Sequence, residues 1–217
     1  MNNFKVVLAS ESPRRKQIME QIGAEFEIWP SQKEETVNST EPEAVCTSLA
    51  EQKALDVAVQ IQAFYENHPD LATPQDILII GADTIVAVQK DKTDGEDACE
   101  ILGKPKNEED AVRMLSMLSG NVHRVLTGIC FVFMQKEGKV RKTSFYEETN
   151  VHVCKLDKEE IAAYVASGEP LDKAGAYGIQ GAFAKYISKI DGDYYNVMGL
   201  PISRMYGELK NFGIKLS

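Results

Sequence analysis

Two adjacent arginines stand where a predicted strand runs into a predicted helix, and their position suits phosphate binding. The apolar run Phe4–Ala9 predicts the strand, and Ser12 with Pro13 predicts the N-cap and first position of the helix. Arg14 and Arg15 then fall in the first helical turn, where the helix dipole disfavours cations. A bound phosphate would remove that conflict, because free amides and two guanidiniums would converge on it. Solvated surface arginines are the alternative interpretation.

An aspartate in a later apolar run is the second candidate for chemistry. In the segment Gly81–Thr84 we expect a flexible glycine to end a strand and to present Asp83 at its edge. A carboxylate at such an edge can hold Mg²⁺ or orient a water for attack. An Asx turn or a helix cap is the structural alternative. Because apolar Ile85 and Val86 continue the strand, the sequence favours the functional interpretation.

Three further positions carry charges that could meet a phosphate or a metal. Lys104 lies between a glycine and a proline, which fix the backbone around a point cation. The pair Glu34-Glu35 follows a strand, and only one of the two acids could face a site. Lys53 lies on an otherwise apolar helix face, where it either reaches solvent along its stem or contacts a buried phosphate. Each position also has an ordinary surface interpretation.

A glycine-rich segment near the end of the chain, Asp172–Gly181, spaces its glycines by three residues. Its backbone could therefore approach a ligand closely without obstruction from Cβ atoms. Gln180 offers both a donor and an acceptor, which suits the edge of a nucleotide base. Turns and a hairpin would explain the glycines, but they would not explain Gln180 or the pair Asp172-Lys173.

Composition limits the classes of protein that these residues could serve. The 217 residues suffice for one large α/β domain or two small ones, and 43% hydrophobic with 26% charged residues is ordinary for a globular chain. We expect no membrane span and no signal peptide, and therefore a cytoplasmic location. The net charge of −9 argues against nucleic-acid binding but not against a small anionic substrate.

Alternating apolar runs and capping signals predict a mixed α/β unit without repeats or linkers. We expect strands at Phe4–Ala9, Glu25–Trp29, Asp76–Gln89, Val122–Gln135 and Val140–Leu156, and helices at Pro13–Gln21, Glu41–Phe64, Asn107–Leu118, Asp157–Ala166 and Leu200–Phe212. The polar segment Lys90–Glu100 is expected to be an exposed hairpin insertion, and His68–Gln75 a loop. Asp191-Gly192 is expected to form a two-residue turn.

The cysteines and histidines form no cluster with the spacing of a zinc site. We expect four reduced, buried thiols at Cys46, Cys99, Cys130 and Cys154. His123 beside Arg124 is expected to be part of a surface pair where a loop enters a strand, with a phosphate contact as the alternative.

Several of these segments, in this order, resemble the Maf family of nucleoside triphosphate pyrophosphatases, which are septum-formation-inhibitor-like proteins. The matching segments are Leu8–Arg15, Gly81–Thr84, Gly103–Pro105, Leu118–Gly120, Asp172–Gly181 and Gly199–Pro201. The resemblance covers nearly the whole chain and implies a single domain over residues 1–217. It also implies a strongly twisted mixed sheet flanked by helices, with two lobes around a nucleotide cleft as in inosine triphosphatase-like folds. A homodimer is common in the family.

The resemblance further implies an activity: hydrolysis of a nucleoside triphosphate to monophosphate and pyrophosphate, as in the removal of non-standard nucleotides. By this resemblance, Asp83 would accept the proton of the attacking water. Asp83 and Glu35 would together bind a divalent metal ion, which would be Mg²⁺ or Mn²⁺, with Co²⁺ as a further candidate. The residues that would bind the substrate are Ser10, Arg14, Arg15, Lys53, Thr84, Lys104 and Gln180. Of these, Arg14, Thr84 and Gln180 resemble the set of the branch that acts on dTTP and UTP.

Two segments depart from the compact family pattern, because residues 60–75 and 89–101 look longer. These longer segments leave open how the protein is regulated and how it contacts other copies, but they do not alter the reaction that the resemblance implies. Two other functions stay open: a nucleotide-binding regulatory protein without turnover, and a phosphatase that releases orthophosphate. We expect a nucleoside triphosphate as the partner, and neither nucleic acid nor membrane.

Overall fold

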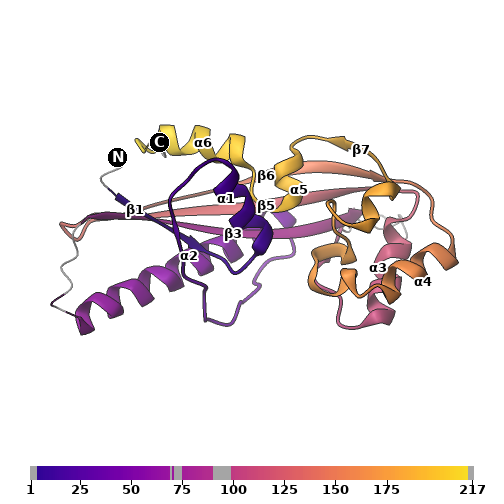
Figure 1. The fold of residues 1–217 in the computed structure, drawn as a ribbon, viewed down its shortest axis with the longest axis horizontal. Coiled ribbons are helices and arrows are strands. Elements are labelled where there is room, and N and C mark those ends of the chain that lie inside the picture. Colours follow the sequence, from indigo (N-terminus) through magenta and orange to yellow (C-terminus); the bar gives the residue numbers. More distant parts are fainter. Residues whose placement is uncertain (1–3, 69, 71–74, 90–98, 215–217) are drawn as a thin grey trace.

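A mixed sheet with helices on both faces forms the body of the molecule (Figure 1). The structure, a computed structural model, describes residues 4–68, 70, 75–89 and 99–214. Within these residues the strands hydrogen-bond in the order β2-β1-β3-β5-β6-β7, and β4 pairs with β3. Their bounds are β1 Phe4–Ala9, β2 Glu27–Ile28, β3 Asp76–Gln89, β4 Cys99–Leu102, β5 Val122–Met134, β6 Val140–Val153 and β7 Ile187–Asp191. The predicted α/β class is confirmed.

The five predicted helices begin and end close to the predicted residues, and the structure adds one short helix at Tyr194–Met198 that was not predicted. Their bounds are α1 Pro13–Gln21, α2 Pro42–Asn67, α3 Glu108–Leu118, α4 Lys158–Ala166, α5 Tyr194–Met198 and α6 Ile202–Asn211, with 3₁₀ turns η1 Glu169–Asp172, η2 Ala174–Ala176 and η3 Ala182–Tyr186. Local caps explain the agreement, since the Ser12 and Asn107 side chains accept from the amides of Arg15 and Asp110. At α4, Asp157 and Glu160 form the predicted capping box.

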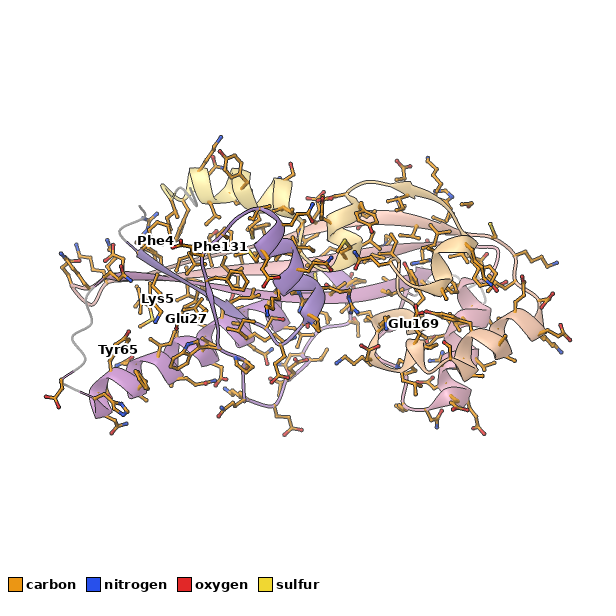
Figure 2. All side chains as sticks on the ribbon, in the orientation of Figure 1. Phe4, Lys5, Glu27, Tyr65, Phe131 and Glu169 are labelled. Atoms are coloured by element: carbon orange, nitrogen blue, oxygen red, sulfur yellow. The ribbon has the colours of Figure 1, made fainter. Side chains whose placement is uncertain are left out.

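The second strand is much shorter than predicted. β2 keeps only Glu27–Ile28 and pairs in parallel with β1 at one edge of the sheet. Both residues are exposed, so no buried face extends the pairing. An ion pair between Lys5 Nζ and Glu27 Oε1, 2.7 Å apart, links the two strands, and these side chains lie beside each other in Figure 2.

Successive residues of the sheet pack against helices on opposite faces. In β1, Val6 and Leu8 belong to a core shared with α1 and α6. Val7 and Ala9 belong to a second core, shared with α2. Figure 1 shows α2 and α6 on opposite sides of this part of the sheet. The predicted apolar face of α2 is confirmed, because these packed positions include Ala50, Ala54 and Val57.

The far ends of the long strands carry a separate lobe. There α3, α4 and the 3₁₀ turns gather around a third core (Figure 1). Its members include Val86 and Val125 from the sheet, Leu115 from α3, and the fully buried ring of Phe183. The strands β3, β5 and β6 thus run through two lobes, which leaves room for a cleft between them.

Two expectations about individual residues were wrong in part. Asp191-Gly192 is no hairpin turn, because Asp191 ends β7 and Asp193 caps α5. All four cysteines are free, but Cys154 is exposed and Cys99 is only half-buried. The predicted hairpin Lys90–Glu100 and loop His68–Gln75 fall mostly outside the described residues; β4 does pair antiparallel with β3, with Cys99 opposite Gln89.

Candidate active site

The candidate site lies where β3 changes its strand neighbour. On one edge, β3 pairs with β1 up to the pair Ala9–Gly81, and with β4 from the pair Val86–Leu102 onward. Within the described chain, the residues from 82 to 85 have no strand partner on that edge. The gap lies just beyond the carboxyl end of β1, and ligands of open α/β sheets bind outside the carboxyl ends of strands. Asp83 and Thr84 lie in this gap, so both can reach a ligand from opposite faces of the strand.

A cleft of about 690 Å³ opens at this gap. That volume falls within the range of ligand pockets. Its walls come from both lobes: the β1–α1 junction, β3 and α2 on one side, and the loops around Lys104 and Tyr177 on the other. Of the predicted residues, it brings together Ser10, Arg14, Arg15, Glu35, Lys53, Asp83, Thr84 and Lys104.

Asp83, Lys53 and Glu35 form a charged cluster on the α2 side of the cleft. Lys53 Nζ contacts Asp83 Oδ1 directly and lies 3.0 Å from Glu35 Oε1. The Lys53 and Asp83 side chains are 16% and 13% exposed, whereas Glu35 is 46% exposed. The two carboxylates therefore converge on one point from a buried and a solvent-facing side. Of the pair Glu34-Glu35, only Glu35 lines the cleft.

The cluster depends on a close approach between α2 and β3 at Gly81. This glycine lies within β3 and does not end it, which corrects the expectation of a flexible strand terminus. A Cβ built there would stand 2.3 Å from the Ala50 carbonyl oxygen and 2.8 Å from the Ala54 Cβ. Asp83 points to the same face two residues later. The close approach of α2 therefore brings Lys53 to Asp83.

Arg15 is buried, not a cationic side chain at the surface. Its Nε donates to the Gly199 carbonyl at 2.7 Å, its Nη1 to Ser10 Oγ at 3.1 Å, and its Nη2 to Thr84 Oγ1 at 3.0 Å. Burial lowers the pKa of Arg15, and the nearby charge of Asp83 opposes that shift. Three of the five guanidinium hydrogens are thus donated to groups of the protein itself. Arg15 ties α1, β3 and the α5–α6 junction together at the cleft wall.

Thr84 belongs to a chain of hydroxyl contacts behind Arg15. Its Oγ1 lies 2.9 Å from Thr127 Oγ1, which donates to the Asn196 carbonyl at 3.0 Å. The buried Asn196 amide nitrogen donates in turn to Val125 O, at 3.0 Å. This chain fixes the wall on which Thr84 stands.

Among the residues that the structure describes, Arg14 and Lys104 are unpaired cations of the cleft, which Lys33 lines as well. Both line it, on the two opposing lobes, and neither forms an ion pair or side-chain hydrogen bond within the described chain. The loop of Lys104 is held in place because the Gly175 amide donates to the Gly103 carbonyl at 3.1 Å. These two side chains fit the phosphate role that the sequence predicted for the arginine pair.

We expect Arg14→Ala or Lys104→Ala to weaken triphosphate binding by about 1.5 to 3 kcal/mol, the scale of a charged hydrogen bond. Steady-state kinetics would show this as a lower kcat/KM. Lys16→Ala is the control for Arg14, because Lys16 lies on the same helix, outside the cleft, and pairs with Glu20. Unchanged KM and kcat in both cleft variants would assign these residues to the surface.

Gln180 does not line the cleft. It is exposed and follows Ile179, which does line it. Its role in reading a base therefore stays a prediction. His123 was placed wrongly: it is 1% exposed, its Nε2 lies 2.8 Å from Tyr177 Oη, and burial lowers its pKa to about 4. A neutral imidazole in the core does not contact a phosphate.

Glu169 organises the glycine-rich loop and was missed by sequence reasoning. Its Oε1 accepts from Tyr164 Oη at 2.9 Å and its Oε2 from the Ala182 amide at 3.0 Å. A Cβ on Gly181 would stand 1.8 Å from Oε1, so this glycine makes room for the carboxylate. Figure 2 places Glu169 in the lobe of α3 and α4. The glycine spacing correctly indicated a close contact of this backbone, but at Gly181 the group in contact is the Glu169 carboxylate and not a ligand.

A divalent cation fits the cluster of Asp83 and Glu35 only in part. Mg²⁺ is typically held by one or two carboxylates, waters and substrate phosphates. The two carboxylates converge on Lys53 Nζ and could supply such a pair. The described residues contain no group of three or more His, Cys, Asp or Glu side chains placed to hold an ion. Substrate oxygens and water would have to complete its shell.

None of the helices in the described ranges has both the length and the apolar character to cross a bilayer.

A family model described as Maf-like protein matches residues 5–212. A protein of Agathobacter rectalis named dTTP/UTP pyrophosphatase is 53% identical over 210 residues, 97% of this chain and 98% of its own. One of Lachnoclostridium phytofermentans with the same name is 44% identical over 213 residues, 98% of each chain. Among solved structures, a nucleoside-triphosphatase, or dITP/XTP pyrophosphatase, of Mycobacterium abscessus aligns over 96% of this chain and 95% of its own, with 9% identity and a TM-score of 0.35.

Proposed function

The chain belongs to the Maf-like protein family, and we propose that it hydrolyses nucleoside triphosphates, dTTP and UTP above all, to nucleoside monophosphate and pyrophosphate. It would be a hydrolase acting on acid anhydrides. The observation that carries the proposal is the convergence of Asp83 and Glu35 on Lys53, in a cleft whose two lobes present Arg14 and Lys104. The names of relatives that match nearly end to end supply the substrate class.

The geometry suits attack by water at the α-phosphorus. Asp83 is a carboxylate on a rigid strand, so it can accept the proton of the attacking water. Ser10 Oγ accepts from Arg15 and from the Ser12 amide, which leaves its own hydroxyl hydrogen to donate to a phosphate oxygen. Arg14, Lys53 and Lys104 would balance the roughly four negative charges of the triphosphate and of the departing pyrophosphate.

Asp83 and Glu35 would hold the divalent ion, which we propose to be Mg²⁺ or Mn²⁺. When bound, it supplies charge neutralisation and polarisation of the phosphate oxygens. We further propose that one Maf-like domain spans residues 1–217, in line with the match over 5–212. A cytoplasmic location and a homodimer stay proposals on the sequence grounds given above.

The product identifies the reaction. We would incubate the protein with individual nucleoside triphosphates and Mg²⁺ or Mn²⁺, and separate pyrophosphate from orthophosphate by chromatography. Pyrophosphate with monophosphate is the expected result. Orthophosphate would identify a phosphatase, and tight nucleotide binding without products would identify a regulatory binding protein.

Substrate choice gives a further prediction, at Gln180. The amide can pair with both the acceptor O4 and the donor N3–H of thymine or uracil, whereas a glutamate offers only acceptors. Because the amide can rotate to follow cytosine, the exclusion of CTP must come from pocket size and Arg14. We expect dTTP, UTP or their 5-substituted forms to be hydrolysed far better than purine nucleotides.

Gln180→Glu should lower this pyrimidine activity and leave the thermal unfolding temperature unchanged. The measurement is kcat/KM for UTP, dTTP and GTP in both proteins. A wild-type preference for GTP, ATP or a methylated guanine nucleotide would remove the chain from the dTTP/UTP branch, though not from the family.

A further inference from the structure

Lys53 stands between the two carboxylates that would hold the metal. Its ammonium contacts Asp83 directly and lies 3.0 Å from Glu35 Oε1, and only 16% of its side chain is exposed. We infer that Lys53 keeps divalent cations out of the free cleft and yields the two carboxylates only when a triphosphate is bound. The inference rests on the proposed function and adds an order of binding to it.

Charge balance in the free cleft supports this order. Asp83 and Glu35 carry two negative charges, and Lys53 neutralises one of them. Arg15 lies close enough for both carboxylates to act on its guanidinium. Two cations thus face two anions, so a divalent ion arriving alone meets a neutral cluster. It would also have to displace an ammonium that is already seated against both carboxylates.

A bound triphosphate changes both the charge balance of the cluster and the position that is favourable for the Lys53 ammonium. Its phosphates offer Lys53 an anionic partner, and its oxygens supply ligands that the protein lacks. The described part of the chain has no third acid, histidine or cysteine placed to complete a metal shell. Because coupling between two ligands is reciprocal, the nucleotide should raise metal affinity by the same factor as the metal raises nucleotide affinity.

The test measures Mn²⁺ binding to the protein without nucleotide, by the electron paramagnetic resonance signal of free Mn²⁺. Lys53→Met keeps the unbranched shape and most of the length of the side chain and removes its charge. We expect Lys53→Met to bind Mn²⁺ at least roughly ten-fold more tightly than the wild type, within the usual range of coupling between sites. Lys53→Arg should behave like the wild type.

Two controls identify the site of the gain. Lys104→Met removes a cleft cation that touches neither carboxylate, and it should leave Mn²⁺ binding at the wild-type level. In the double variant Lys53→Met with Asp83→Asn, the added Mn²⁺ affinity should disappear. If Lys104→Met increases Mn²⁺ affinity as much as Lys53→Met does, the increase comes from the lower positive charge of the whole cleft, and the inference is wrong.

A second measurement uses the wild type alone, so it does not depend on the folding of a variant. The ligand is a UTP analogue with an imido bridge between the α and β phosphorus atoms. The complex of protein and analogue should bind Mn²⁺ more tightly than the free protein does, and more tightly than the analogue alone does in solution. Equal Mn²⁺ affinity with and without the analogue would overturn the inference, as would tight binding to the free wild type that Lys53→Met does not improve. Pyrophosphate release by the wild type tests the proposed function separately, because Mn²⁺ binding requires no turnover.

Discussion

Asp83→Asn is expected to lower turnover by at least ~100-fold, the scale of a lost general base. Asparagine keeps the shape of the side chain but removes the charge that metal binding and proton acceptance both need. The carboxylate is 13% exposed and held against Lys53, so little solvent can replace it. Initial rates of pyrophosphate release at saturating nucleotide would measure the loss.

Glu34→Gln is the matched control for this prediction. Glu34 is an exposed acid beside Glu35, but it does not line the cleft. Its variant should turn over substrate at nearly the wild-type rate, and both variants should unfold at nearly the wild-type temperature. If Asp83→Asn kept near-normal turnover, Asp83 could not be the proton acceptor.

Gly81→Ala is expected to lower the free energy of unfolding by about 3 kcal/mol or more, which is the upper range for overpacking in a core. The new Cβ would stand 2.3 Å from the Ala50 carbonyl oxygen, a backbone atom that cannot rotate away. Helix α2 would have to retreat from β3 and would move Lys53 away from Asp83. For a chain of this size, the melting temperature should fall by about 6 to 12 °C.

Gly103→Ala separates packing from the general effect of adding a methyl group. A Cβ at Gly103 would meet nothing within 4 Å, and its backbone has no positive φ. Its melting temperature should stay close to that of the wild type in the same calorimetric scan. Equal stability of Gly81→Ala and the wild type would show that α2 does not pack on β3 as closely as the structure has it.

Elements with strong local signals were predicted almost to the residue. β1, β3 and α1 have the predicted bounds, because a capping serine with proline and uninterrupted apolar runs determine them locally. The short β2 was overpredicted, since its length depends on pairing with β1 and not on its own residues. The same reason explains Asp191-Gly192, where a helix follows instead of a second strand.

Most of the predicted site residues line the cleft, with Gln180 as the exception, but the separate role of each residue was not predicted. The sequence placed Arg14 and Arg15 together as phosphate ligands. In the fold, Arg15 turns inward to the carbonyl of Gly199, 184 positions along the chain, and Arg14 is left facing the cleft. Neighbours in sequence on a helix point in different directions, and only the surrounding structure decides which one is buried.

The sequence by itself determined the α/β class, most element bounds and the family, because capping, alternation and motif order are local properties of the chain. Tertiary structure decided what depends on distant partners: the burial of His123, the close approach at Gly81 and the place of Lys53 between two carboxylates. It also decided that Glu169 accepts from Tyr164 and from the Ala182 amide beside Gly181. Each of these depends on which surfaces the fold brings within a few ångströms, and spacing along one strand or helix carries no such information.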